Sequence, residues 1–204
     1  MEYLLSAIIG YLFGSIPSAY LILKKKKGID ITSAGTGNVG AMNSYEVTNS
    51  KSIGFLVLFL DFIKAVIPVV IILLFLESSF LIASISLLFA IFSHCFNPWL
   101  GFKGGRGLAT AAGGSAIIFP FLLIAWILFW ILVYVIKKDI HNANIFATVL
   151  SLLSVLTFPR NLIQFAYPQP VLVNELILFT SAGLLIIFIK HIDPLKDIIL
   201  NKKK

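Results

Sequence analysis

The chain has 204 residues, of which 59% are hydrophobic and only 12% are charged. Soluble domains of this size are about half apolar and about a quarter charged, so the composition excludes an ordinary soluble fold and indicates an integral membrane protein. The net charge of +7 does not indicate nucleic-acid binding, because the lysines flank apolar stretches and form no soluble basic domain.

Six apolar stretches are candidates for membrane spans, since a hydrocarbon core of ~30 Å requires about 20 apolar residues. The first is followed by lysines and lacks a basic segment before it, so we interpret it as an uncleaved span and not as a signal peptide. In chain order, the stretches are 4–23, 54–76, 78–96, 108–136, 145–158 and 171–189.

The stretch 108–136 decides the number of crossings. As one helix it would be ~43 Å long, and Pro120 would kink or break it. Two shorter crossings that meet near Pro120 place nearly all of the 16 Lys and Arg residues on one side, which the positive-inside rule assigns to the cytoplasm. A single helix would divide the basic residues almost evenly. We therefore predict an all-α integral membrane protein, a single membrane domain over 1–204, with about seven transmembrane helices, the N-terminus outside and the C-terminus cytoplasmic.

A polar loop, AGTGNVGAMN, lies between the first two spans. Glycines allow positive φ angles and close approach of the backbone to a ligand, and the hydroxyl and amides can form hydrogen bonds. Because glycine and asparagine also favour turns, a turn-rich connector is the alternative interpretation. The candidate ligand residues are Gly35, Thr36, Gly37, Asn38, Gly40 and Asn43.

A second loop, FKGGRG, precedes the stretch that begins at Leu108. Successive N–H groups in a glycine-rich turn form an anion-binding concavity, and the N-terminus of the following helix also favours phosphate. Two cationic side chains add to this. A flexible connector with ordinary topology-setting charges is the alternative. The candidate residues are Lys103, Gly104, Gly105, Arg106 and Gly107.

Several ionisable residues lie within or at the ends of the spans. Asp61 and Lys64 share one helix face, so they are either a structural ion pair or support a site. His94 and His191 can accept protons or form hydrogen bonds near neutral pH, although span ends often carry polar residues without a catalytic role. His141 is expected in a loop, and we assign no function to it.

The sequence lacks several common chemical signatures. Cys95 is the only cysteine, so no intramolecular disulfide is possible, and the histidines lack metal-ligand spacing. We therefore expect no metal and no cofactor. No nucleophile motif is present either, so any chemistry must rely on anion binding and a weak base.

The motifs occur together in an order that resembles a known family. They are GYLFGSIPSAYLILK (10–24), GTGNVGAMN (35–43), DFIKA (61–65), SHCFNPWLGFKGGRGLAT (93–110) and KH (190–191). This set resembles the bacterial acyl-phosphate:glycerol-3-phosphate acyltransferases, the PlsY family. The resemblance implies a multi-pass enzyme of the bacterial plasma membrane with a site facing the cytoplasm. It also implies acyl transfer from acyl phosphate to the first hydroxyl of glycerol 3-phosphate, which gives lysophosphatidic acid and phosphate for phospholipid synthesis.

The resemblance also implies roles for individual residues. Thr36 occupies the position of a family serine, Lys103 and Arg106 that of two basic residues, and His191 that of a histidine near the glycerol hydroxyl. We predict Thr36, Lys103 and His191 as catalytic, and Asp61 and Lys64 as supporting. The predicted substrate-binding residues are Gly35, Gly37, Asn38, Gly40, Asn43, His94, Gly104, Gly105, Arg106 and Gly107.

Departures from the family pattern lie in the part of the site expected to hold the acceptor. Glu46 replaces an arginine, Met42 replaces a polar residue, and Pro194 and Asp197 replace an asparagine and an arginine. Two alternatives therefore remain: an acyltransferase for a different acceptor alcohol, or a non-catalytic membrane protein that binds phosphorylated lipid. The expected partners are acyl phosphate, glycerol 3-phosphate and membrane lipids, with no nucleic acid.

Overall fold

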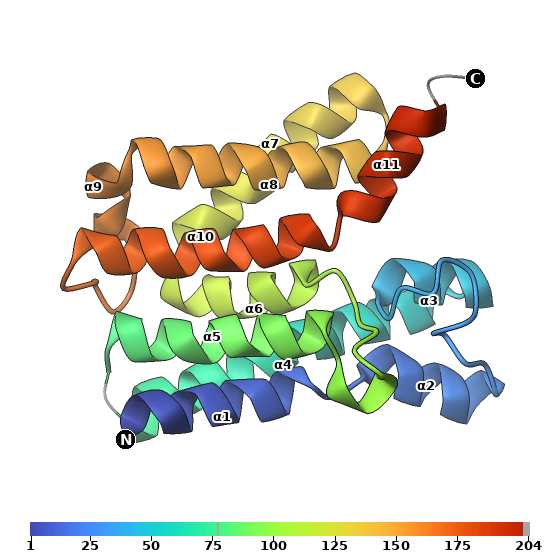
Figure 1. Ribbon diagram of the computed structural model, residues 1–204, viewed down its shortest axis with the longest axis horizontal. Helices are drawn as coiled ribbons and strands as arrows, with labels where there is room; N and C mark the ends of the chain where they lie inside the picture. The colour runs from blue at the N-terminus through green and yellow to red at the C-terminus, as the bar shows by residue number, and fades with distance from the viewer. Residues whose placement is uncertain (77, 202–204) are drawn as a thin grey trace.

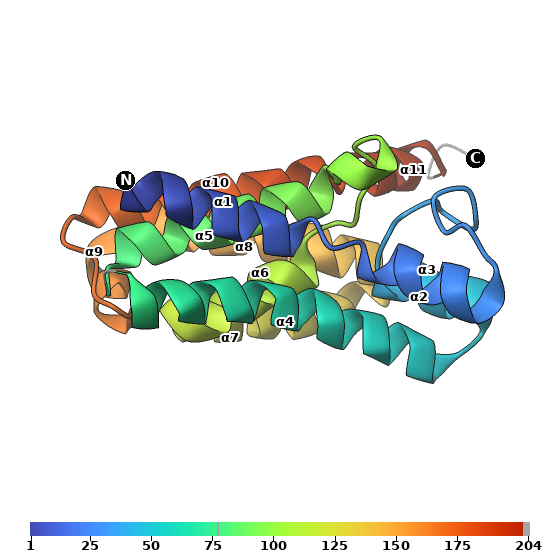
Figure 2. The same cartoon turned by 90° about the horizontal axis from the view of Figure 1, so that it is seen from below.

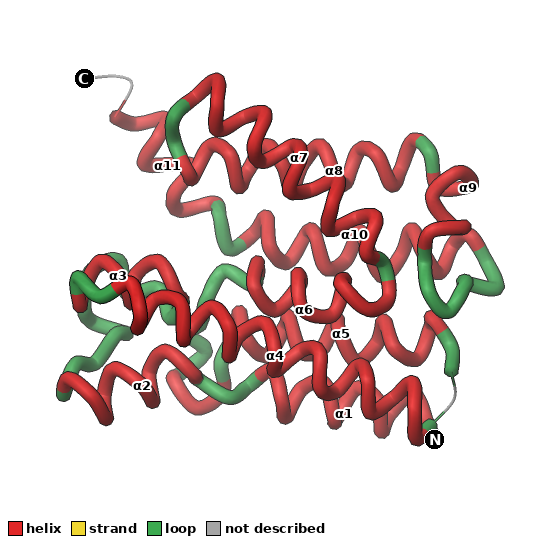
Figure 3. The backbone as a smooth tube through the Cα atoms, turned by 180° about the vertical axis from the view of Figure 1, so that it is seen from behind, coloured by secondary structure: helices red, strands yellow, loops and turns green. Residues whose placement is uncertain are grey.

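The computed structural model describes residues 1–76 and 78–201, apart from the side chains of 197–199 and 201. Over these ranges the chain forms helices and loops and no strand (Figure 3). The helices are α1 (Glu2–Gly14), α2 (Ser18–Lys27), α3 (Ala41–Thr48), α4 (Lys51–Phe75), α5 (Phe80–Cys95), η1 (Pro98–Leu100), α6 (Leu108–Ile118), α7 (Pro120–Lys137), α8 (Ile140–Thr157), α9 (Pro159–Leu162), η2 (Ile163–Phe165), α10 (Val173–Ile189) and α11 (Ile192–Asn201).

The apolar helices run back and forth along the long axis of one bundle (Figure 1). Helices α1, α5, α7 and α10 start at the end that holds the N-terminus, and α4, α6 and α8 return to it. Seen from below, α1, α5 and α10 lie along one side and α4 and α7 along the other (Figure 2). Because the bundle helices alternate in direction, α11 lies at the end opposite the N-terminus.

Hydropathy and length mark the bundle as a membrane domain. In the described chain, five helical stretches are long and apolar enough to cross a membrane, and two shorter apolar helices accompany them. The five are Glu2–Lys27, Lys51–Phe75, Phe80–Leu100, Pro120–Lys137 and Ile140–Thr157, and the two shorter helices are Leu108–Ile118 and Val173–Ile189. Helix α6 is only ~16 Å long at 1.5 Å per residue.

The stretch 108–136 is broken where the sequence predicts it. Helix α6 ends at Ile118, Phe119 leaves the helical conformation at φ −153° and ψ 64°, and α7 begins with Pro120 as its first residue. Proline fits the first turn of a helix, where its missing N–H is not needed, but it cannot continue a helix that precedes it.

The predicted first span, 4–23, falls within the candidate membrane span Glu2–Lys27, and it consists of two helices with a break at Pro17. Helix α1 ends at Gly14 and α2 starts at Ser18, with Pro17 between them at φ −85° and ψ 69°. Pro17 has no N–H to donate to the Phe13 carbonyl. In a continuous helix its ring would also crowd that carbonyl. His141 is helical and not in a loop, because the Asp139 carboxylate caps α8 by accepting from the Asn142 N–H at 2.7 Å.

Glycines allow the helices of the bundle to approach closely, as small residues commonly do in membranes. A Cβ at Gly10 of α1 would overlap the backbone of Ser86 in α5, and a Cβ at Gly113 of α6 would overlap the backbone of Phe62 in α4. A Cβ at Gly114 of α6 would overlap the side chain of Leu87 in α5, so α5 and α6 are also held side by side and the loop that joins them has a defined position.

Basic residues are concentrated at the end of the bundle that carries α2, α3 and α11. Lysines lie in the last turn of α2, at the start of α4, at the end of α7 and in α11, whereas Arg160 in α9 is at the other end (Figure 1). Lys202, Lys203 and Lys204, which the sequence predicts on the basic side, lie outside the described residues.

Candidate functional site

A polar cavity of about 390 Å³ lies at the basic end of the bundle. It is formed by the loop before α3, the loop before α6, and the junction of α10 with α11. A hydrogen bond from the Val39 N–H to the Gly104 carbonyl, at 3.3 Å, joins the two loops. The lining residues are Thr36, Gly37, Asn38, Phe96, Phe102, Lys103, Gly104, Arg106, Ile189, Lys190, Asp193 and Pro194.

The first loop is organised around the buried side chain of Asn43. Its amide nitrogen donates to the carbonyls of Ala34 and Asn38 at 3.0 and 2.9 Å, and its oxygen accepts from the Thr36 N–H at 3.0 Å. Gly37 has a φ of 71°, which favours glycine. The polar atoms of Asn43 are therefore used to shape the loop, while Thr36 and its two successors line the cavity.

The second loop rests on the end of α5. The Gly105 N–H donates to the carbonyl of His94 at 3.1 Å, and a Cβ at Gly105 would overlap His94 Nε2. A Cβ at Gly104 would overlap the carbonyls of His94 and Cys95. Only glycines permit this contact, so the backbone of the loop is held directly against the end of the helix.

A buried ionic network lies behind the second loop. Lys64 Nζ is 2.8 Å from Asp61 Oδ1, 2.8 Å from His94 Nδ1 and 3.0 Å from the Ile16 carbonyl oxygen. An ammonium group only donates, so Nδ1 of His94 accepts and the neutral ring carries its proton on Nε2, the atom beneath Gly105. The network connects α4, α5 and the segment after α1, and through His94 it supports the second loop.

The two cations of the second loop have different surroundings. Lys103 is exposed, whereas Arg106 is half-buried and its Nη1 lies 3.3 Å from His141 Nδ1. Burial lowers the pKa of Arg106, and the nearby carboxylates of Glu46 and Asp193 oppose that shift. Arginine stays protonated at neutral pH regardless, so both residues present positive charge near the cavity.

His191 lies at the junction of α10 and α11 and is 1% exposed. Its Nδ1–H donates to the Ile187 carbonyl at 2.8 Å, so Nε2 carries the lone pair. Among the described side chains, Nε2 is a buried ring nitrogen with no hydrogen-bond partner. Burial lowers the pKa of His191 to about 4. The ring is thus neutral at physiological pH, and its Nε2 can accept a proton. His191 is not among the residues that line the cavity.

The structure groups the predicted residues into two sets. Those that line the cavity are Thr36, Gly37, Asn38, Lys103, Gly104 and Arg106, and those that lie behind it or shape the loops are Gly35, Gly40, Asn43, Asp61, Lys64, His94, Gly105, Gly107 and His191. Sequence reasoning missed Phe96, Phe102, Lys190 and Asp193. For Lys190, the sequence held a usable signal, because this lysine directly precedes His191 in the KH motif.

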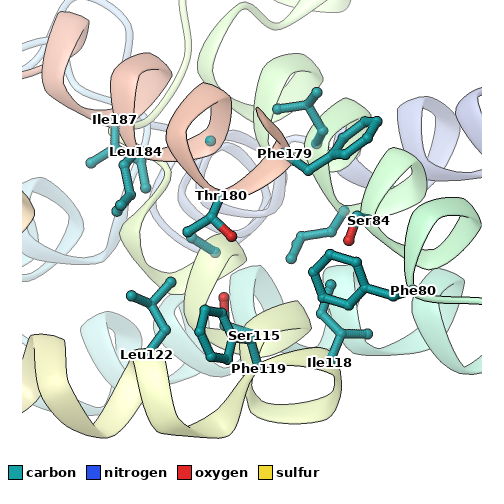
Figure 4. A pocket seen from close by; sticks show the side chains of 14 residues that line it. Phe80, Ser84, Ser115, Ile118, Phe119, Leu122, Phe179, Thr180, Leu184 and Ile187 are labelled. Atoms are coloured by element: carbon teal, nitrogen blue, oxygen red, sulfur yellow. The ribbon is translucent and has the colours of Figure 1, made fainter. Parts of the chain in front are cut away.

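Apolar cavities lie among the bundle helices, and the two described next share no lining residue with the polar cavity. One of about 470 Å³ begins at Leu108, directly after the second loop, and lies among α4, α6, α7, α8 and α10. A smaller one of about 50 Å³ lies between α5, α6 and α10, and shares Ser115, Leu122 and Ile187 with the first (Figure 4). The larger apolar cavity reaches Leu108, two residues after Arg106 of the polar cavity, so the two cavities are close along the chain.

Taken together, these features define a polytopic helical membrane protein with a polar cavity, lined by glycine loops and cationic side chains, at one end of its bundle. The family model of glycerol-3-phosphate acyltransferases matches residues 4–201. The chain belongs to this family of membrane acyltransferases.

Individual relatives agree with this assignment. A glycerol-3-phosphate acyltransferase of Pelagibacter ubique is 38% identical over 81% of each chain. One of Wolbachia pipientis is 30% identical over 100% of this chain and 98% of its own. The crystal structure of PlsY, an integral membrane glycerol 3-phosphate acyltransferase, in its glycerol 3-phosphate form superposes with a TM-score of 0.81 at 28% identity, covering 98% of this chain and 94% of that one.

Proposed function

We propose that this enzyme transfers an acyl group from acyl phosphate to the first hydroxyl of glycerol 3-phosphate, and releases lysophosphatidic acid and phosphate. The observation that carries the proposal is the joining of both glycine loops, Lys103 and Arg106 around one polar cavity, while an apolar cavity in the bundle is lined by Leu108, directly after the second loop. Such a site holds a phosphate and a fatty chain at the same time. PlsY has also been crystallised in a lysophosphatidic acid form, and that structure superposes on this chain with a TM-score of 0.80.

The chemistry requires no protein nucleophile. The hydroxyl oxygen of the acceptor attacks the acyl carbonyl carbon, the bond from that carbon to the phosphate oxygen breaks, and the phosphate leaves. Because an acyl phosphate is already activated, the enzyme gains most from orienting the two substrates and from stabilising the developing negative charge. Backbone N–H groups of the loops, the Thr36 hydroxyl and the Lys103 ammonium have this role in our proposal.

His191 is proposed to take the proton of the acceptor hydroxyl. The hydrogen bond from its Nδ1–H to Ile187 leaves the lone pair on Nε2, and its low pKa keeps the ring neutral at physiological pH. A general base contributes typically ~10²–10⁴-fold to a rate. Since Nε2 is buried, side chains around it must move for the acceptor to reach it.

The acyl chain is proposed to occupy the apolar cavity that begins at Leu108. Its lining is almost wholly hydrocarbon and aromatic, with Trp126 and Trp130 from α7 and Leu184 from α10. Burial of each methylene there contributes about 0.8 kcal/mol. The acyl carbonyl would then lie beside the second loop, where the leaving phosphate meets Lys103 and the loop amides.

The orientation in the membrane follows from the charges at the two ends. We propose seven crossings by α1, α4, α5, α6, α7, α8 and α10, with the site facing the cytoplasm. Nearly all described cations outside the bundle centre lie at the end that holds the site, as cytoplasmic segments do. A cytoplasmic site gives access to soluble glycerol 3-phosphate.

Glu46 supports a second candidate, an enzyme of the same class for another acceptor alcohol. Its carboxylate is close enough to Arg106 to affect the pKa of that residue. A carboxylate there repels the phosphate of glycerol 3-phosphate, and it would favour an acceptor with less negative charge. The experiment must therefore identify the product.

The test is release of phosphate from palmitoyl phosphate by the purified protein, with and without glycerol 3-phosphate, with lipid products identified by mass spectrometry. Acceptor-dependent release with lysophosphatidic acid supports the proposal, and Lys103→Ala should abolish it. Release without that product indicates another acceptor or hydrolysis. No release by folded protein would favour a non-catalytic membrane protein that binds phosphorylated lipid.

A further inference from the structure

Lys190 lines the cavity from a third segment, which is distant in sequence from both loops. It directly precedes His191. It is the C-cap residue of α10, and its side chain lines the same cavity as Thr36, Lys103 and Arg106. Its Nζ is 5.0 Å from the centroid of the Phe96 ring, a distance typical of a cation–π contact. An aromatic face holds the cation near the cavity without neutralising it.

The other cations of the cavity, Arg106 and Lys103, are held differently. Arg106 contacts His141 and is close to the carboxylates of Glu46 and Asp193, so part of its charge is already balanced. Lys103 is exposed and free to adopt many rotamers. In the described part of the chain the salt bridges join Asp61 with Lys64 and Asp193 with Lys196, and Lys190 is in neither of them.

The substrates bring more negative charge than Lys103 and the partly balanced Arg106 offset. A phosphate monoester carries about −1.5 to −2 at pH 7, and the proposed reaction brings two phosphates near one cavity. Like charges so close repel strongly unless cations lie among them. A third cation that is preplaced and not paired with a carboxylate meets this requirement.

We propose that Lys190 is a substrate-binding residue, whose ammonium donates hydrogen bonds to a phosphate group held in the cavity. The inference rests on the proposed function for the identity of the ligand, either acyl phosphate or glycerol 3-phosphate. It assigns the end of α10 to the site, in addition to the two glycine loops.

Lys190→Ala, Lys190→Arg and Lys196→Ala test the inference in the full-length protein. Loss of a charge-assisted hydrogen bond raises the KM for the substrate concerned by roughly 10- to 100-fold, so this rise is expected for Lys190→Ala. Lys190→Arg keeps the charge and should keep most of the affinity. Lys196→Ala removes an exposed lysine that does not line the cavity, so both KM values should stay unchanged. A rise for glycerol 3-phosphate places Lys190 on the acceptor phosphate, and a rise for acyl phosphate places it on the donor.

Protection by inorganic phosphate provides a readout that does not require turnover. Inorganic phosphate should raise the melting temperature of the wild type and of Lys196→Ala in detergent, and should do so much less for Lys190→Ala. Unchanged KM values together with undiminished protection in Lys190→Ala would overturn the inference, even if acyl transfer itself is confirmed. If the wild type is inactive, the proposed function fails, and the protection experiment alone decides whether Lys190 binds phosphate.

Discussion

Gly105→Ala should inactivate the enzyme by displacing the second loop. The added Cβ would overlap His94 Nε2, lie 2.5 Å from His94 Cε1 and lie 2.8 Å from the carbonyl oxygen of Val39. The ring cannot withdraw easily, because its Nδ1 is 2.8 Å from the buried ammonium of Lys64. The backbone of the loop must therefore move.

The required movement sets the size of the effect. Carbon atoms pack at about 3.5–4.0 Å, so the loop must shift by about 1 Å to relieve the contact. A misplacement of 1 Å in an active site reduces rates by roughly 10²-fold. Overpacking of this kind also destabilises a fold by about 1–3 kcal/mol, so the melting temperature should fall while the protein still folds.

The assay is acceptor-dependent phosphate release, with melting measured in the same detergent. Gly183→Ala is the matched control, because it adds the same methyl group to a buried glycine whose nearest Cβ neighbour would be Ile91 Cδ1 at 3.6 Å, an ordinary contact. It should retain wild-type activity. Unchanged kcat and KM in Gly105→Ala would refute the view that the contact with His94 fixes the catalytic position of the loop.

Three further predictions concern charges. Lys64→Met leaves Asp61 buried without its partner and should lower the free energy of unfolding by about 3–5 kcal/mol. Adding Asp61→Leu should recover most of the lost melting temperature, and equal stability of the two variants would contradict this. Because folded His191 has a lowered pKa of about 4, the unfolded chain binds its proton first as pH falls below ~6.5. The free energy of unfolding of the wild type should therefore decrease from pH 6.5 to 4 more steeply than that of His191→Gln. Parallel pH dependence in the two proteins would contradict the lowered pKa of His191. Glu46→Arg should lower the KM for glycerol 3-phosphate by up to roughly 5-fold, as expected for an exposed charge, and an unchanged KM would show that position 46 does not face the acceptor.

Most of the fold could be predicted from the sequence, because lipid imposes strong local rules. Apolar stretches must be helical to satisfy their backbone in a membrane, and the break at Pro120 follows from the missing N–H of proline. The same rule applies at Pro17, where hydropathy alone suggested a continuous span and the structure has two helices.

Sequence reasoning proposed candidate residues for the site, and their roles stay predictions. Because glycine-rich loops with nearby cations favour anion binding, Thr36, Lys103 and Arg106 could be proposed before their positions around one cavity were known. The scaffold role of Asn43 could not, since the hydrogen bonds of its side chain to Ala34 and Asn38 depend on how the loop closes.

What the sequence by itself determined is the membrane class and the helical elements, because each depends on residues close together in the chain, and the phosphate-binding role of the two loops stays a prediction. Only the tertiary structure decided that the loops meet, that His94 supports Gly105 and that Lys190 lines the same cavity. These contacts join residues far apart in sequence. They arise because helices of alternating direction bring their ends together, and because glycines let those helices pack at backbone contact.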